Sequence, residues 1–281
     1  MHNIYSIDMA ADGLKYGLQA APTSIQVSLF AGLILSLWFA ELFLSTQPWK
    51  SKWNHTKINL LFTSTALPLQ VGLILIVLLI CNWVTTRHWG ILYLLPWSGS
   101  AWIKYLFGFL LLDFFEYFYH RMVHKVHNFW RFHMVHHSDP EVDVSTTVRE
   151  HPGETILRVL FLAVVVFASG ASLGLLAIRQ TVQTVSNLTS HTDLMLPAKA
   201  DRILNKLFIT PNLHHVHHHF ELPYTDCNYG DVLSIWDRLF GTFREKKDIE
   251  YGVDVWNGEA ASRFFSLMKA PLSKINRKLQ E

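Results

Sequence analysis

Residues 101–124 read AWIKYLFGFLLLDFFEYFYHRMVH, an apolar and aromatic run that leads directly into two histidines, His120 and His124. About twenty apolar residues are enough for a helix to cross the hydrocarbon core of a bilayer. The spacing of four residues places both imidazoles on the same face of a helix. This stretch therefore predicts a membrane helix from Ala101 to Tyr119 whose end presents histidines at the cytoplasmic surface.

Three other apolar regions flank this helix in the sequence. Ser24–Leu44 and Ile58–Val84 each have the length of a membrane span. Thr155–Leu188 is longer and has small residues near its middle, which favours a helical hairpin that returns to the same side of the membrane. A single long crossing is the alternative. Residues 46–57 carry lysines beside tryptophans, which is typical of a cytoplasmic interfacial loop.

Together these regions predict an all-α fold: an integral membrane helical bundle of about three spans plus a membrane hairpin, with a cytosolic, helical, histidine-rich di-metal cap. We expect N-terminal membrane helices in residues 1–100 and a cytosolic C-terminal tail in residues 246–281; the resemblance described below makes residues 101–245 the expected catalytic domain. The composition agrees, because 16% of the residues are charged, against about 25% in soluble domains. The net charge of +2 gives no reason to expect a nucleic-acid partner.

Histidine is the unusual residue of the chain, with 16 copies. Two clusters of the form HxxHH, His133–His137 and His214–His218, follow the HxxxH of the membrane helix. Because residues three and four apart share a helix face, we expect each cluster to present its imidazoles to one point. The spacing leaves out His215 and His219. The three clusters supply more imidazoles than one metal ion can take, so they predict two ions.

At this point the sequence resembles the fatty acid hydroxylase and sterol desaturase superfamily, from about Leu110 to Phe243. The resemblance rests on DFFEYFYHRMVH (113–124), FHMVHHS (132–138), REHPGE (149–154), His191, TPNLHHVHH (210–218) and NYGDVLSIWDRLFGT (228–242). It implies a cytosol-facing di-metal centre, functionally iron, and oxygen-dependent hydroxylation or desaturation of a lipid. It also adds His191 to the metal ligands, which are then His120, His124, His133, His136, His137, His191, His214, His217 and His218.

One position departs from the pattern of the superfamily. Asn187 stands four residues before His191, where fatty acid hydroxylases can carry a further histidine. Acidic residues near the clusters are candidates for the outer partners that orient metal-binding imidazoles. These candidates are Asp113, Glu116, Asp139, Glu150, Asp193, Asp226 and Asp231. We expect His151 to be structural or an outer partner of a metal ligand, and His127 to be a spare group or such an outer partner.

The expected cofactor is a pair of iron ions, with zinc as an alternative occupant because imidazole suits iron, zinc and copper alike. The chain has no GxGxxG motif and no cysteine pattern for an iron–sulfur cluster or a c-type haem. A separate reductase, ferredoxin or cytochrome b5-like protein must therefore supply electrons, and the lipid substrate must come from the bilayer.

The predicted location is a bacterial inner membrane, or the endoplasmic reticulum membrane in a eukaryote, with the site facing the cytosol. The competing interpretation is a zinc-handling or zinc-transporting membrane protein. Transporters place ligands inside their spans, near the midplane of the bilayer. Here the clusters follow the spans, which favours an enzyme.

Overall fold

The computed structural model describes residues 23–45, 48–97, 101–254 and 261–273. Within these ranges every regular element is a helix, and the only β-type pairings are isolated bridges. The all-α expectation is therefore confirmed for the described part of the chain.

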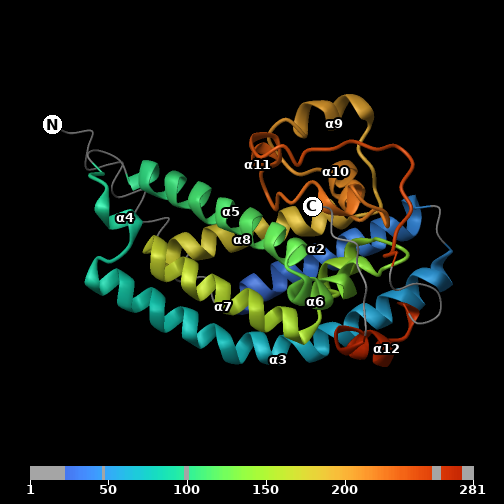
Figure 1. The fold of residues 1–281 in the computed structure, drawn as a ribbon, viewed down its shortest axis with the longest axis horizontal. Coiled ribbons are helices and arrows are strands. Elements are labelled where there is room, and N and C mark those ends of the chain that lie inside the picture. Colours follow the sequence, from blue (N-terminus) through green and yellow to red (C-terminus); the bar gives the residue numbers. More distant parts are fainter. Residues whose placement is uncertain (1–22, 46–47, 98–100, 255–260, 274–281) are drawn as a thin grey trace.

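Five long helices form an elongated bundle (Figure 1). They are α2 (Thr23–Leu44), α3 (Trp49–Arg87), α5 (Ala101–Lys125), α7 (Pro152–Ser169) and α8 (Leu173–His191). The short helix α4 (Ile91–Leu94) lies at one end of the bundle. A cap covers the other end, built mainly from α9 (Ala198–Leu204), α10 (Pro211–His217) and α11 (Ile235–Leu239). The remaining short elements are α6 (His127–His137), α12 (Phe264–Lys269), η1 (Val144–Val148), η2 (Tyr224–Asp226) and η4 (Ala270–Leu272).

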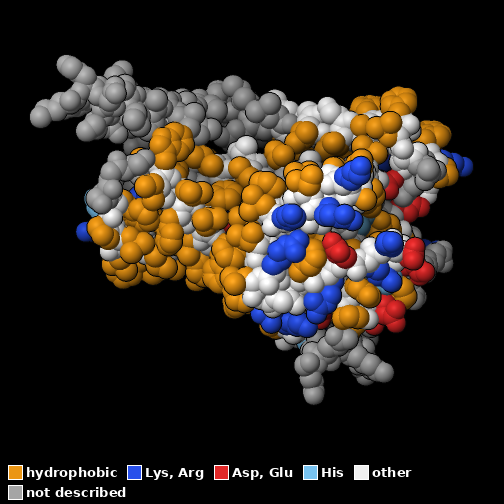
Figure 2. Space-filling model, turned by 90° about the horizontal axis from the view of Figure 1, so that it is seen from above, with side chains coloured by type: hydrophobic (Ala, Val, Ile, Leu, Met, Phe, Trp, Pro, Cys, Tyr) orange, Lys and Arg blue, Asp and Glu red, His pale blue; other side chains and the backbone are white. Residues whose placement is uncertain are grey.

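The outer surface of the bundle is apolar. Along α3 the exposed fractions of Leu67, Val71, Leu75 and Leu79 are 51%, 60%, 60% and 71%, at helical spacing on one face. Figure 2 shows hydrophobic side chains over one half of the molecule, with charged side chains gathered on the other half. A contiguous exposed apolar surface of this kind marks contact with a membrane.

Two described helical segments are long and apolar enough to cross a membrane, Trp49–Leu94 and Pro152–Ser169. They pack together through Val77, Cys81 and Val84 on one side and Val159 and Ala163 on the other. The predicted third span exists as α5, but that helix also carries Lys104, Asp113 and Glu116. The number of crossings therefore stays a prediction.

The region predicted as a hairpin is divided into α7 and α8 at residues 170–172. Gly170 adopts φ 75°, and a Cβ atom there would lie 2.2 Å from the carbonyl oxygen of Trp89, so only glycine fits the turn. The two helices run antiparallel, and the start of α7 and the end of α8 lie at the capped end of the bundle (Figure 1).

The predicted interfacial loop over residues 46–57 is wrong, because α3 begins at Trp49. Lys52 is 2% exposed and forms an ion pair with Glu41 of α2 at 2.6 Å and another with Asp143, just before η1. The lysine side chain lies inside the protein because two carboxylates, one of them 91 residues away, neutralise it there.

The described part of the C-terminal segment packs on the bundle. Leu267 and Ala270 join a buried cluster with Phe62 of α3 and with Trp130 and Met134 of α6. This cluster fixes α6, which carries three of the predicted ligands, against α3.

Candidate metal centre

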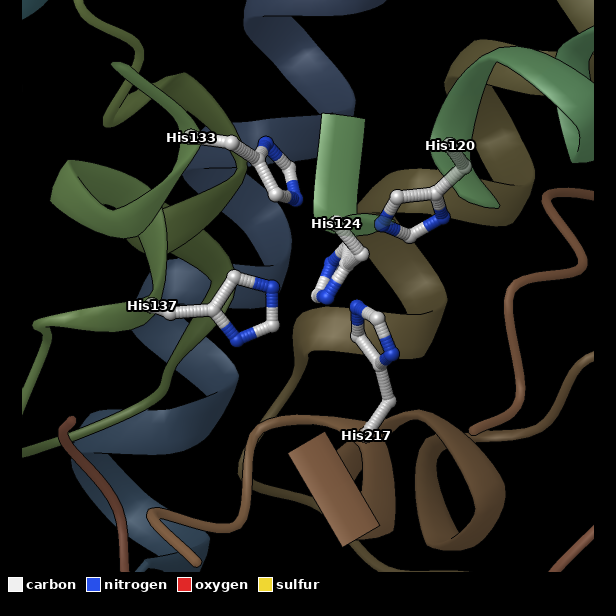
Figure 3. A group of neighbouring side chains, drawn as sticks. All are labelled: His120, His124, His133, His137 and His217. Carbon is white, nitrogen blue, oxygen red and sulfur yellow. The ribbon is translucent and has the colours of Figure 1, made fainter. Parts of the chain in front are cut away.

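Nine histidine side chains meet in two adjoining groups at the capped end of the bundle. The five-histidine group contains His120, His124, His133, His137 and His217, and the four-histidine group contains His136, His191, His214 and His218. In each group the ligand atoms lie within 4.8 Å of one another. Figure 3 shows the rings of the five-histidine group turned toward a common centre from α5, α6 and α10. The structure thus brings together all nine residues that the sequence predicted.

The expectation that each HxxHH cluster serves one point is wrong. His133 and His137, four residues apart, enter the five-histidine group, whereas His136 enters the other. In the third cluster His214 and His218 share the four-histidine group, and His217 joins the first. Successive residues on a helix are rotated by about 100°, so neighbouring rings diverge while rings four apart converge. Each HxxHH therefore connects the two groups.

Four rings of the five-histidine group place Nδ1 against an oxygen atom outside the group. The acceptors are the Tyr229 carbonyl for His120 (3.0 Å), the Cys227 carbonyl for His217 (2.6 Å), Glu154 for His133 (2.7 Å) and Asp226 for His124 (3.3 Å). A carbonyl oxygen only accepts hydrogen bonds, so the proton lies on Nδ1 of His120 and His217 and the Nε2 lone pair is left for a ligand. The carboxylates favour the same tautomer, as outer partners of metal-binding imidazoles do.

In the four-histidine group, too, an Nδ1 atom faces an acceptor oxygen and leaves Nε2 for a ligand. His191 donates from Nδ1 to the Asn187 carbonyl at 2.8 Å, so its Nε2 carries a lone pair. That Nε2 lies 3.1 Å from Nε2 of His136 and 3.0 Å from Nε2 of His214, which is itself 3.2 Å from Nε2 of His218. A shared cation satisfies four converging nitrogen atoms better than any set of hydrogen bonds among them.

Burial keeps these imidazoles neutral, which is the form that binds metals. Burial, reinforced by neighbouring imidazoles, holds the pKa of His136, His137, His214 and His218 well below its ordinary value. The pKa of His191 is lowered to about 4, again chiefly by burial. Both ring nitrogens of His137 and Nε2 of His133 are buried and have no hydrogen-bond partner among the described residues. The residues present therefore fit a metal ion in each group.

Only part of the predicted outer shell contacts the histidines. Asp226 does, and Asn187 contributes its backbone carbonyl. Asp113 instead accepts from Trp236 Nε1 at 2.8 Å, and Asp193 accepts from Ser45. Glu116, Glu150 and Asp231 face Arg158 or Arg179, and Asp139 faces His55.

Glu154, which accepts a hydrogen bond from His133, was not among the outer partners predicted from the sequence. It lies in the REHPGE stretch, which alone could have drawn attention to it. His151, in the same stretch, has the expected structural role, because its Nδ1 accepts from Gly153 N at 2.9 Å and caps α7.

A buried polar network, Glu41–Lys52–Asp143, supports the four-histidine group from α2 and α3. Glu41 accepts from Thr192 Oγ1 at 2.8 Å and from Asp193 N at 2.9 Å, which are the two residues after His191. Beside this network, His55 pairs with Asp139 at 2.6 Å. The burial of Lys52 and His55 could not be predicted from the sequence, because their partners come from distant segments.

Residues 105–242 match the sequence profile of the fatty acid hydroxylase family, and all nine histidines lie inside this range. The chain therefore contains a fatty acid hydroxylase domain. The resemblance seen in the sequence is therefore confirmed.

Several relatives in this family are hydroxylating enzymes by name. Ornithine lipid hydroxylase OlsE of Rhizobium tropici is 30% identical over 174 residues, which are 61% of this chain and 51% of the relative. Alkylglycerol monooxygenase is 34% identical over 161 residues in Xenopus tropicalis (57% of this chain, 34% of the relative) and 33% identical over 164 residues in Homo sapiens (58% and 35%). The chain thus spans about half of OlsE and about a third of each of these alkylglycerol monooxygenases. No solved structure matches it.

Proposed function

We propose that this protein is a membrane-bound oxygenase that uses molecular oxygen and external electrons to hydroxylate a lipid, with one metal ion in each histidine group. The observation that carries the proposal is the convergence of nine histidines in two buried groups at one end of a lipid-facing bundle. The names of the relatives, a lipid hydroxylase and monooxygenases, support hydroxylation over desaturation.

Iron is the metal that we assign to both groups. Imidazole ligands suit iron, zinc and copper, but zinc has no redox chemistry and could not pass electrons to oxygen. Bound iron would supply the activation of oxygen needed to attack an unactivated C–H bond. The nine histidines would hold the two ions, and zinc is the alternative occupant of the protein as purified.

The protein's own residues orient the ligands and control access to them. The outer acceptors, above all Glu154 and Asp226, fix the tautomer and direction of the rings. Burial keeps bulk water away, and the exposed apolar faces of the bundle give a lipid a route from the bilayer. Electrons would come from a separate reductase, ferredoxin or cytochrome b5-like donor.

The cap faces the cytosol in this proposal, with residues 101–245 as the catalytic domain. Exposed basic side chains gather on the cap, among them Arg202, Lys206, Arg238, Arg244 and Lys247. Basic residues mark the cytoplasmic side of membrane proteins. We place the protein in a bacterial inner membrane, or in the endoplasmic reticulum membrane of a eukaryote.

The test is incorporation of labelled oxygen. Iron-loaded protein in detergent, supplied with an electron donor, a membrane lipid extract and ¹⁸O₂, should produce ¹⁸O-labelled lipid. His137→Ala should reduce the label at least about a hundredfold, since removing a ligand costs no less than removing its outer partner. His127→Ala, on the same helix but outside both groups, should keep the label. If the lipid carries no ¹⁸O label even with the wild-type protein, the proposal is contradicted and the zinc-handling alternative is favoured.

A further inference from the structure

A small cavity lies between α5, α7 and α8, close to the five-histidine group. Leu112 and Phe115 of α5 and Phe161 and Val165 of α7 give it an apolar lining. Two charged side chains also line it, Glu116 of α5 and Arg179 of α8. An ion pair at the edge of an apolar cavity in a membrane bundle indicates a functional site.

The ion pair leaves one strong donor unused. Arg179 Nη2 donates to Glu116 Oε2 at 3.0 Å, and the Arg179 side chain is 5% exposed. Arg179 Nε is buried and has no hydrogen-bond partner among the described residues. A second carboxylate, Asp231, lies 3.7 Å from Arg179 Nη2, but it makes no hydrogen bond to Nε among the described residues. A buried guanidinium N–H without an acceptor is costly, so the site calls for an oxygen atom from a ligand.

The cavity adjoins the metal centre along α5. Glu116 is four residues before His120, a rise of about 6 Å along the helix. Glu116 also accepts from Arg158 at 3.0 Å, and Arg158 donates to Glu154 at 2.9 Å. Glu154 is the acceptor for His133 in the five-histidine group. A ligand in the cavity would therefore lie next to the predicted ligands.

The helices that line the cavity also have apolar outer faces. Leu160 and Val164 of α7 and Val182 of α8 are exposed apolar side chains on the outer face of the same helices. A molecule that reaches the cavity from this side must itself carry a hydrocarbon chain. Combined with the unused donor, this indicates an amphipathic ligand whose oxygen atom lies at the inner end.

We propose that Arg179 and Glu116 form the subsite for the polar linkage of a membrane lipid. Arg179 Nε donates to a hydroxyl, ether or carbonyl oxygen of that linkage, and Glu116 holds the guanidinium in place. The cavity has room for little more than that oxygen atom, so the adjoining hydrocarbon lies along the exposed apolar faces of α7 and α8. The inference rests on the proposed function and sharpens it, because it directs the reaction to carbon atoms near the polar linkage rather than to the distant end of a chain.

The test is binding of 1-O-hexadecylglycerol to the metal-loaded full chain in phosphatidylcholine nanodiscs, without oxygen so that no turnover occurs. Arg179→Lys keeps a cation beside Glu116 but removes the Nε–H donor. It should raise the Kd at least about tenfold, the effect of losing a hydrogen bond from a charged group. Metal content and melting temperature should remain those of the wild type.

Two controls separate recognition from structure. Arg158→Lys makes the same change in an arginine that pairs with Glu116, Glu150 and Glu154 but does not line the cavity, and its Kd should stay within about twofold. Hexadecane, which has no oxygen atom, should bind wild type and Arg179→Lys equally.

Three outcomes would overturn the subsite: no saturable binding to the wild type, an unchanged Kd in Arg179→Lys, or equal weakening in both arginine variants. Because binding is measured without oxygen, Arg179-dependent binding would stand even if the ¹⁸O₂ assay found no oxidation. The two proposals therefore fail separately.

Discussion

The two histidine groups share α6 and the α10 segment, whereas α5 serves only the five-histidine group and α8 only the four-histidine group, and they are supported in different ways. In the five-histidine group, two carboxylates accept directly from imidazoles, Glu154 from His133 and Asp226 from His124. In the four-histidine group, the outer acceptor found is the Asn187 carbonyl on His191. The anionic support there acts one step away, through Glu41, which holds the backbone just after His191.

The difference indicates a division of labour between the groups. Carboxylates hydrogen-bonded to imidazoles make the rings more basic and strengthen metal binding. The five-histidine group should therefore hold its metal more tightly, and the four-histidine group should depend on how well the fold positions His191. Four experiments test this difference between the groups.

The largest effect is expected from Lys52→Met. The substitution leaves Glu41 and Asp143 buried without their shared cation, which costs about 3–5 kcal/mol of unfolding free energy. Metal should be lost from the four-histidine group first. Denaturant unfolding and metal content in detergent measure both effects, and Lys57→Met, at an exposed position of the same helix, is the control. Equal loss of metal from the two groups would contradict the greater dependence of the four-histidine group on the fold.

Acid should weaken the metal-free protein through the buried imidazoles of both groups, and His191 of the four-histidine group accounts for a definite share. The pKa of His191 is about 4 in the fold, against an ordinary 6.5, so the unfolded chain takes up a proton first as the pH falls. The His191 contribution is present above about pH 6.5 and is lost progressively toward pH 4, about 3 kcal/mol in all. Unfolding of chelator-treated protein across this range measures it. In His191→Asn the unfolding free energy should fall less steeply between pH 6.5 and pH 4. The same pH dependence in this variant and in the wild type would contradict the contribution assigned to His191.

Glu154→Gln tests the five-histidine group. It keeps an oxygen acceptor for His133 but removes the charge, and should weaken metal binding in that group about 10- to 100-fold. Competition with a chelator measures the affinity. Glu150→Gln is the matched control, because Glu150 also pairs with Arg158 but bonds to no histidine among the described residues. A similar loss in both variants would assign the effect to Arg158 instead.

The smallest effect is expected from Asn187→His. Position 187 is one helical turn before His191 and shares its face. An added imidazole there should slow the release of metal from the four-histidine group, by up to about tenfold, and leave the other group unchanged. Timed chelator extraction measures the release. Faster release would mean that the new ring displaces His191 from its carbonyl acceptor.

The sequence predicted the features that depend on local spacing. HxxxH and HxxHH lie within about one helical turn, so eight of the nine predicted ligands could be read directly from the chain, whereas His191 came from the resemblance to the superfamily. The break between α7 and α8 was equally local, because Gly170 marks it. Even so, local spacing could not show that His136 and His137 would face different groups.

Features that depend on distant partners could not be predicted. Lys52 looked interfacial because its neighbours include Trp49 and Trp53, and only the approach of Glu41 and Asp143 makes its burial favourable. Glu154 is 21 residues from His133, and the fold alone brings the two together. In both cases the role of a charged residue was not predicted, because its partner is distant in the sequence.

The most direct test of the central claim is the metal content of the detergent-purified protein beside His136→Ala and His217→Ala. Each variant removes one imidazole from a different group. Two independent metal sites predict about two iron ions in the wild type and about one in each variant, since a site that loses a ligand binds its ion much more weakly. A single zinc ion per chain, or metal content unaffected by both substitutions, would contradict a di-metal centre held by these histidines.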